Sequence, residues 1–173
     1  FRWRDGQLFL AKMKEPLPVV WSRDVPDGAP STVTVSRDTA GRYFVSMLFE
    51  DETAPAEPSG WDVGIDVGLK DFATLSTGQK IENPRWLRSK EKQLARYQRM
   101  IARKTKGSNN RAKARRKVAR VHAEVADARR DFHHQLSTEI VRKFDTIVIE
   151  DLAVSNMIKN HNLAKSISDA GWG

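Results

Sequence analysis

The sequence predicts an α/β domain that contains a long helical hairpin and follows a smaller β-rich segment. Three observations lead to this fold class. Short apolar runs alternate with turn residues over residues 1–50, a polar stretch with two prolines follows at residues 51–60, and the apolar period becomes helical from about residue 84. Strands joined through a helical crossover are typical of α/β folds.

Four short antiparallel strands are expected in the first segment, at residues 7–12, 18–21, 32–36 and 43–49. The last two carry apolar residues at every second position, and residues 38–41 (Asp-Thr-Ala-Gly) fit a hairpin connection between them. Strands of this kind suggest part of a small barrel or sandwich. They carry no functional signature of their own.

The polar stretch at residues 51–60 marks a domain boundary, because it lacks apolar periodicity. We therefore expect a β-rich segment over residues 1–58 and a second domain over residues 59–173, with the hairpin inserted at about 84–144. The chain starts at Phe1 rather than at a methionine and stops at Gly173. It is interpreted as a piece of a longer polypeptide, with an incomplete second domain.

Within the second domain, residues 61–67 are predicted to form a buried strand, residues 72–76 a second strand, and residues 80–81 the start of a third. Residues 146–150 (Thr-Ile-Val-Ile-Glu) are β-branched and predict another buried strand, reached through the helical crossover. A helix is expected to follow from about Leu163, with Asn162 as its cap.

Two apolar stripes at spacings of three, four or seven predict the helices of the hairpin. A polar loop at residues 104–110 separates them, so the stripes face each other and the remaining surface is basic. The stripes consist of Leu87, Leu94, Tyr97 and Ile101, and of Val118, Val121, Val125, Ala128, Phe132, Leu136 and Ile140.

Positive charge is concentrated in this hairpin. The chain has a net charge of +8, but residues 85–144 hold 19 basic and 5 acidic side chains, a local net charge of +14. Charge runs are often only solvated helix faces, yet the run at residues 111–120 contains six basic residues and no acidic residue that would offset the repulsion. We expect a polyanionic partner, with phosphate contacts that set affinity and register. The candidate contacts are Lys104, Lys106, Arg111, Lys113, Arg115, Arg116, Lys117 and Arg120.

Several classes of protein and site are disfavoured. The chain has no apolar run of the roughly 18 residues that a membrane span needs, so it is expected to be soluble and cytoplasmic. It contains no cysteine, which rules out disulfides and thiolate zinc sites within this span. His133, His134 and His161 have no partner at metal-ligand spacing, and we assign no histidine to catalysis. Trp86 and Tyr97 could stack on bases, although Tyr97 lies on an apolar stripe.

Two of the apolar strands end in a carboxylate, Asp66 and Glu150. A buried strand has no packing reason to hold an unpaired charge, and a crossover unit can place its two strands side by side and parallel. Two carboxylates meeting there favour a raised pKa on one of them or a divalent cation between them, and oxygen ligands suit Mg²⁺ or Mn²⁺. The structural alternatives to a metal site are an ordinary Asp-x-Gly turn at Asp66 and a cap at the strand end for Glu150.

The second domain contains three ordered motifs: Gly-Ile-Asp-Val-Gly-Leu-Lys at residues 64–70, Val-Ile-Glu-Asp-Leu at residues 148–152, and Asn-His-Asn-Leu-Ala-Lys-Ser-Ile-Ser-Asp-Ala-Gly-Trp at residues 160–172. These motifs resemble the RuvC-like nuclease domain of the TnpB (OrfB) proteins of insertion sequences, which are relatives of type V CRISPR effectors. The match covers about residues 60–173, and residues 1–58 resemble the end of that family's wedge domain more weakly.

The resemblance implies an RNase H-like (RuvC) fold with a mixed sheet and an RNA-guided DNA endonuclease that binds guide RNA and target DNA in a prokaryotic cell, associated with the nucleoid. Asp66 and Glu150 would be the first two catalytic and metal-binding carboxylates, acting in two-metal phosphodiester hydrolysis. The hairpin would lie along the RNA–DNA heteroduplex.

The chain departs from that family in lacking the four-cysteine zinc ribbon and the final catalytic aspartate, which normally lie further downstream. Asp169 belongs to the third motif and is not that aspartate. This span alone should therefore cleave poorly. Two alternatives stay open: a catalytically incomplete nucleic-acid-binding module, and an ATPase of the actin-like or sugar-kinase type, which would need a glycine-rich nucleotide-binding segment.

Overall fold

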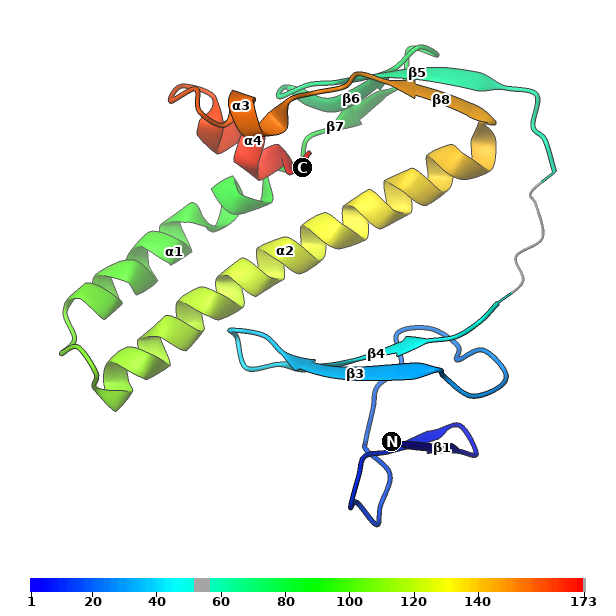
Figure 1. The fold of residues 1–173 in the computed structure, drawn as a ribbon. Coiled ribbons are helices and arrows are strands. Elements are labelled where there is room, and N and C mark those ends of the chain that lie inside the picture. The colour runs from blue at the N-terminus through cyan, green and yellow to red at the C-terminus, as the bar shows by residue number, and fades with distance from the viewer. Residues whose placement is uncertain (52–56, 173) are drawn as a thin grey trace. The chain divides into compact units, whose positions relative to one another are not determined.

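The computed structural model describes residues 1–51 and 57–172. The chain divides into two compact units, Phe1–Ala56 and Glu57–Gly173. Figure 1 shows their elements, with unit 1 all β and unit 2 mixed α/β. No helix in the described part of the chain is long and apolar enough to cross a membrane.

Unit 1 contains two separate antiparallel hairpins. Strands β1 (Arg2–Arg4) and β2 (Gln7–Phe9) pair with each other, and β3 (Thr32–Arg37) pairs with β4 (Tyr43–Leu48). The predicted β3–β4 hairpin is confirmed. Its turn is held by Asp38, whose Oδ1 accepts a hydrogen bond from the Arg42 backbone N–H at 2.8 Å.

The first half of unit 1 differs from the prediction. Residues 18–21 form no strand, because Pro16 and Pro18 lack the N–H that a ladder needs, and Val20 is 98% exposed. Strand β1 was not predicted. Its turn is Asp5-Gly6, with φ of 50° and 72°, a geometry that suits the tight two-residue loop of a hairpin. Among the residues described, these two-stranded sheets do not join into a barrel.

Unit 2 is built on a four-stranded mixed sheet. Strands β5 (Asp62–Val67), β6 (Asp71–Leu75), β7 (Lys80–Glu82) and β8 (Thr146–Ile149) lie in the order β7-β6-β5-β8. Strands β5, β6 and β7 pair antiparallel, whereas β8 pairs with β5 in parallel, as the crossover predicted.

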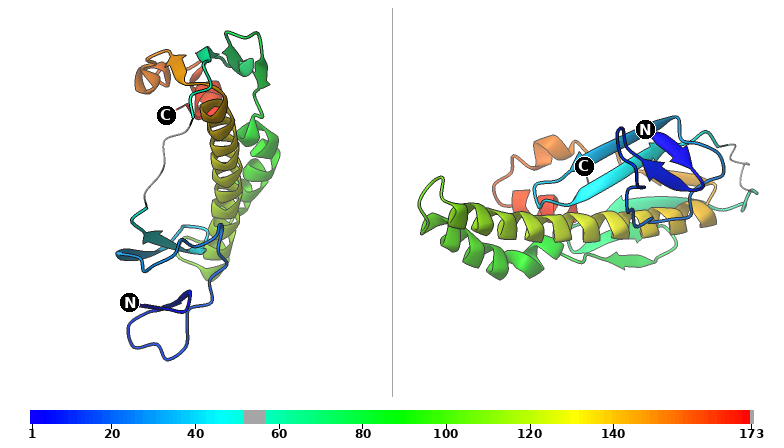
Figure 2. Two further views of the ribbon diagram at one scale, coloured as in Figure 1. Left: turned by 90° about the vertical axis from the view of Figure 1, so that its right-hand side faces the viewer. Right: turned by 90° about the horizontal axis from the view of Figure 1, so that it is seen from below.

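The predicted helical hairpin is confirmed as α1 (Trp86–Ala102) and α2 (Asn109–Lys143). Figure 1 and both views in Figure 2 show the two helices running antiparallel side by side. Helix α2 begins after Ser108, whose hydroxyl accepts a hydrogen bond from the Arg111 N–H at 3.2 Å and so caps the helix. Leu94 of α1 and Val121 and Val125 of α2 are buried along the seam.

The last turns of α2 cover one face of the sheet. Ile140 packs with Val63 of β5 and Leu75 of β6 in a buried cluster, joined by half-buried neighbours that include Ile65 and Leu136. Side chains alternate between the two faces of a strand. The residues that separate Val63, Ile65 and Val67 in the sequence therefore point to the face away from α2. Asp66 is one of them.

Strand β8 is not buried, contrary to the prediction. It lies at the sheet edge, and Ile147, Val148 and Ile149 are 37%, 62% and 66% exposed. An edge position explains the difference, because β8 pairs with another strand on one side only. Apolar composition indicated a strand correctly but not its burial.

Two short helices complete the unit, α3 (Val154–Met157), which was not predicted, and α4 (Ala164–Ala170). The expected Asn162 cap is wrong, since α4 begins after Leu163 and has no side-chain cap. Helix α4 is anchored by Ile167, which is 1% exposed, and by Asp169. The Asp169 carboxylate accepts hydrogen bonds from the N–H groups of Leu87 and Arg88 in the first turn of α1.

Candidate metal centre and nucleic-acid interface

Asp66 lies near the end of β5 on the sheet face opposite α2, and it is exposed. The strand turns two residues later at Gly68. A Cβ at Gly68 would approach the Asp71 carbonyl oxygen to 2.9 Å, so a larger residue would disturb the turn into β6. An ordinary turn therefore accounts for the glycine of Asp-x-Gly, Gly68. It does not account for the aspartate at position 66.

Glu150 follows β8 directly. The parallel register pairs Ile65 of β5 with Ile149 of β8. Asp66 and Glu150 are the residues that follow this pair, so they lie beside each other. Both side chains line one hollow of about 440 Å³ on the sheet. The structure therefore brings the two predicted carboxylates to the same site.

The structure does not support the burial argument for a cation at this site, however. Both carboxylates are exposed, so the free energy of burying an unpaired charge is not what requires a cation there. What remains is the proximity of two carboxylates in one hollow. Over residues 1–51 and 57–172, no group of three or more histidine, cysteine or acidic side chains is placed to hold a metal ion.

Two hydroxyl residues of this hollow were missed from the sequence, Thr74 and Ser76. Thr74 of β6 pairs directly with Asp66 across the antiparallel ladder. The Ser76 hydroxyl accepts a hydrogen bond from the Gly64 N–H at 3.0 Å, and the Ser76 N–H donates to the Gly64 carbonyl at 2.8 Å. Polar residues at alternate positions of a strand opposite Asp66 are the signal that could have identified them.

The donor set of the hollow suits a hard divalent cation. Carboxylate and hydroxyl oxygens are the ligands that Mg²⁺ and Mn²⁺ prefer, and Mg²⁺ is usually held by one or two carboxylates together with water and substrate phosphates. Asp66 and Glu150 fit that pattern without a third protein carboxylate.

Asp145 fixes the start of both carboxylate-bearing strands. Its carboxylate accepts hydrogen bonds from the Ser59 N–H at 2.8 Å, the Ser59 hydroxyl at 3.0 Å and the Gly60 N–H at 2.7 Å. These hydrogen bonds lower the pKa of Asp145 below its usual value. The bonds from the Ser59 and Gly60 backbone N–H groups have the largest effect. The entries to β5 and β8 are thereby tied together.

The eight candidate phosphate-binding residues are not equivalent. Lys113, Arg116 and Arg120 are exposed and, at spacings of three and four, share one side of α2. Arg115 and Lys117 flank that side, and the Lys117 ammonium lies 5.8 Å from the centre of the Tyr97 ring. Lys106 is exposed in the connecting loop, whereas Lys104 is half-buried. Arg111 is half-buried too, and its buried Nε has no hydrogen-bond partner among the described residues.

Three of the aromatic and histidine candidates are half-buried: Trp86, Tyr97 and His133. The Trp86 ring packs edge-on against Phe132 at 5.1 Å, which core packing explains, whereas the Tyr97 ring contacts the Lys117 ammonium. His133 is half-buried between Phe72 and Phe132, and burial lowers its pKa below the usual value. His134 and His161 are exposed.

Comparison with known proteins gives a consistent set of relatives. A family described as "Probable transposase" (OrfB of IS605) matches residues 43–161. A "Putative RNA-guided DNA endonuclease" of Streptomyces pristinaespiralis is 58% identical over 173 residues, covering 99% of this chain and 43% of that protein. "Putative RNA-guided DNA endonuclease InsQ" of Escherichia coli K12 is 38% identical over 161 residues, covering 84% of this chain and 40% of that protein.

A more distant relative is the "TnpB-like protein L770" of Acanthamoeba polyphaga mimivirus, 25% identical over 162 residues, 87% of this chain and 29% of that protein. The chain thus spans less than half the length of these curated relatives. The family match covers most of the chain and includes both carboxylate-bearing strands. This chain belongs to the OrfB (TnpB) family of IS605-type elements.

Proposed function

We propose that this chain is part of an RNA-guided DNA endonuclease of a transposable element. The observation that carries the proposal is the placement of Asp66 and Glu150 on adjacent parallel strands, lining one hollow. The relatives named as RNA-guided DNA endonucleases support the reaction class. In this proposal the sheet of unit 2 is an RNase H-like (RuvC) core, and unit 1 is part of a wedge-like domain.

Asp66 and Glu150 are the residues that would hold Mg²⁺ or Mn²⁺, each through a carboxylate oxygen. A pair of divalent ions held by these residues would supply activation of water and stabilisation of the leaving oxygen of a phosphodiester. The Thr74 and Ser76 hydroxyls line the same hollow and offer further oxygen contacts. The Asp145 hydrogen bonds hold the two strand entries together, which keeps the carboxylates in register.

The partners proposed are a guide RNA and a target DNA, bound in the cytoplasm of a prokaryotic cell on nucleoid DNA. The exposed side of α2 would contact the backbone of their heteroduplex, because Lys113, Arg116 and Arg120 offer phosphate contacts without reading bases. The described residues include no group of histidine, cysteine or acidic side chains placed to hold zinc.

One observation favours the catalytically incomplete alternative for this span taken alone: the described residues supply two carboxylates to the hollow and no third. We therefore expect the isolated span to bind nucleic acid but to cleave it poorly. The ATPase alternative gains no support from the fold, since the basic hairpin is unexplained by it.

The test starts from the intact protein purified after expression with its flanking element. We expect a discrete RNA to co-purify, to be identified by sequencing, and we expect Mg²⁺-dependent cleavage of DNA complementary to that RNA. The Asp66→Asn and Glu150→Gln variants should retain the RNA and lose cleavage. An intact protein that carries no RNA and cleaves no complementary DNA contradicts the proposal, and retained cleavage in both variants contradicts the site assignment.

A further inference from the structure

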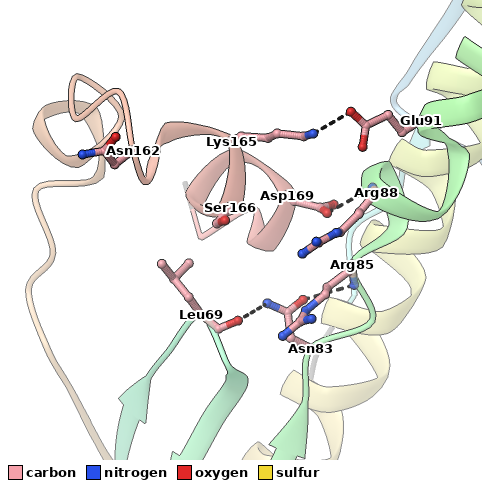
Figure 3. A pocket seen from close by; sticks show the side chains of 9 residues that line it. All are labelled: Leu69, Asn83, Arg85, Arg88, Glu91, Asn162, Lys165, Ser166 and Asp169. Atoms are coloured by element: carbon pink, nitrogen blue, oxygen red, sulfur yellow. Dashed lines mark hydrogen bonds and ion pairs between the residues drawn. The ribbon is translucent and has the colours of Figure 1, made fainter. Parts of the chain in front are cut away.

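A second polar cleft lies at the opposite end of α1 from the connecting loop of the hairpin. It has a volume of about 290 Å³ and lies between the turn after β5, the segment that joins β7 to α1, the first turns of α1, and α4 (Figure 3). That volume is near the lower end of the roughly 300–1,000 Å³ typical of small-ligand sites, so it suits a small chemical group.

Several hydrogen bonds hold the walls of this cleft in place. Asp169 of α4 accepts from the Leu87 N–H at 2.8 Å and from the Arg88 N–H at 3.2 Å, which docks α4 on the start of α1. Asn83 donates from its side-chain amide to the Leu69 carbonyl at 3.1 Å and accepts from the Arg85 N–H at 3.1 Å. The backbone that carries Arg85 and Arg88 is therefore fixed on both sides.

The acidic groups of the cleft already have partners. Asp169 is 6% exposed and its two oxygens are used by the N–H groups of α1. Glu91 accepts from the Lys165 ammonium at 2.6 Å. This hydrogen bond, together with the charge of Lys165 and a smaller electrostatic contribution from Arg88, lowers the pKa of Glu91 below its usual value, so Glu91 is ionised and paired at neutral pH.

The two arginines, in contrast, form no ion pair among the described residues, although Arg88 acts electrostatically on Glu91. Within the part of the chain that the structure describes, no carboxylate lies within 4.0 Å of the Arg85 or Arg88 guanidinium. Figure 3 shows both side chains extending from the start of α1 into the space that α4 and the Leu69 turn enclose. Asn162 and Ser166 line the same cleft and offer neutral hydrogen-bonding groups.

We propose that this cleft binds a phosphodiester group of a nucleic-acid strand, with Arg85 and Arg88 as its donors. A guanidinium matches the geometry of phosphate oxygens through two parallel N–H groups, and it stays charged at any physiological pH. An anion in the cleft would offset the positive charge of the two guanidinium groups, neither of which is in an ion pair. Neither the carboxylate site nor the basic stretch of α2 includes these residues.

The proposal rests on the proposed function and adds a second anchor to it. Helix α1 has 17 residues, which at a rise of about 1.5 Å each separates the cleft from the far end of the hairpin by roughly 25 Å. A strand contacted at both ends would be held along the length of α1. Phosphate contacts at two separated points fix the register of a duplex better than one cluster does.

The test compares two pairs of variants in the intact protein. Arg85→Gln with Arg88→Gln removes the two cleft guanidiniums. Arg96→Gln with Arg99→Gln removes the same charge from exposed positions of α1 outside the cleft. Binding of a labelled RNA–DNA hybrid duplex is measured against salt concentration, and thermal melting confirms that each variant is folded.

We expect the cleft pair to weaken hybrid binding about ten-fold or more, as for loss of charge-assisted hydrogen bonds, and to reduce the salt slope by about one unit. The control pair should change affinity much less. Arg85→Lys with Arg88→Lys should keep the salt slope but lose part of the affinity, because lysine retains charge without the planar fork. Equal losses in the cleft and control pairs would overturn the cleft assignment, as would an unchanged affinity in the cleft pair.

Inorganic phosphate distinguishes a strand from a free anion. If the cleft serves a strand, phosphate should compete with the hybrid no better than chloride at equal ionic strength, and strong competition by phosphate would instead assign the cleft to a free anion. The proposed function fails separately: in that case the unaltered intact protein would neither carry RNA nor bind the hybrid. Normal binding by that protein, with equal losses in both variant pairs, overturns this inference alone.

Discussion

Asp145 and Ser59 form a tie across the base of the sheet, in which the Asp145 carboxylate accepts from the Ser59 N–H at 2.8 Å and from the Ser59 hydroxyl at 3.0 Å. The Asp145 N–H in turn donates to the Trp61 carbonyl at 2.8 Å. Ser59 lies three residues before β5, and Asp145, 86 positions further along the sequence, immediately precedes β8. The register that places Asp66 beside Glu150 begins at this tie.

The tie predicts a pH dependence of stability in the acid range. Hydrogen bonds lower the pKa of Asp145 in the folded state, so protons bind more readily to the unfolded chain. The stabilisation is complete above the unfolded pKa of about 3.9 and is lost as the pH falls through the lowered folded value. Asp145→Asn should reduce the free energy of unfolding at neutral pH and weaken its dependence on pH below about pH 4, measured by urea titration. Asp62→Asn, an exposed change at the start of β5, is the control; identical pH profiles for both variants would contradict the tie.

The hollow at Asp66 and Glu150 predicts binding of Mn²⁺ that depends on both side chains. Replacing both by alanine should weaken Mn²⁺ binding by more than about 100-fold, since even outer-shell changes cost 10–100-fold in metal affinity. Calorimetric titration with Mn²⁺ measures this, and Asp62→Asn on the same strand serves as the control. Unchanged Mn²⁺ binding in the double variant would show that the hollow is not a metal site.

Gly171, at the end of α4, predicts a packing constraint that involves Arg129. Gly171 has φ of +73°, and a Cβ there would lie 2.4 Å from the Cδ of Arg129. Gly107 has a similar φ of +85° with nothing within 4 Å, which makes it a matched control. Gly107→Ala should cost about 1–2 kcal/mol in unfolding free energy for left-handed backbone strain alone. Gly171→Ala should cost about 0.5–1.5 kcal/mol more, because the far end of the flexible Arg129 side chain must leave its preferred rotamer.

A double-mutant cycle separates the two contributions at Gly171. In an Arg129→Ala background the overlap disappears, so Gly171→Ala should then cost about as much as Gly107→Ala, roughly 1–2 kcal/mol. An equal cost of Gly171→Ala in both backgrounds would mean that Arg129 does not restrict the position.

Local patterns in the sequence predicted the elements that depend on local interactions. The β3–β4 hairpin, the two helices and the crossover to a parallel β8 follow from periodicity and turn residues, and all are present. The strand predicted at residues 18–21 from its apolar content is absent, because Pro16 and Pro18 remove the N–H donors that a strand ladder needs. Strand β1 was missed although Asp5-Gly6 is a strong hairpin signal.

The features that could not be predicted depend on contacts between distant residues. Asp169 caps α1 from 82 residues away, and nothing local distinguishes it from an exposed aspartate. The exposure of β8 is a property of its place in the sheet, which its sequence of Thr-Ile-Val-Ile does not reveal. The sequence predicted that Asp66 and Glu150 lie close together on neighbouring strands and that both are buried. The strand order is present, but both carboxylates are exposed, so burial plays no part.

The geometry of α2 divides the basic residues that the sequence alone treats as equal. With 3.6 residues per turn, successive residues are about 100° apart, so Lys113, Arg116 and Arg120 fall within roughly 60° of one another. Arg115 and Lys117 are separated by about 160° and cannot both contact one strand. Lys117 also lies against the Tyr97 ring.

Replacing Lys113, Arg116 and Arg120 with alanine in the intact protein should therefore weaken binding to all sequences alike. The salt slope for an RNA–DNA hybrid should flatten by up to about three units, one for each phosphate contact. The control is the pair Arg115→Ala and Lys117→Ala, whose loss per removed charge should be smaller because at most one of the two residues faces the same strand. Equal loss per charge in both sets would mean that the hairpin acts as a diffuse field, and a loss confined to one target sequence would mean that α2 reads bases. Either result would contradict a backbone-contacting face formed by Lys113, Arg116 and Arg120.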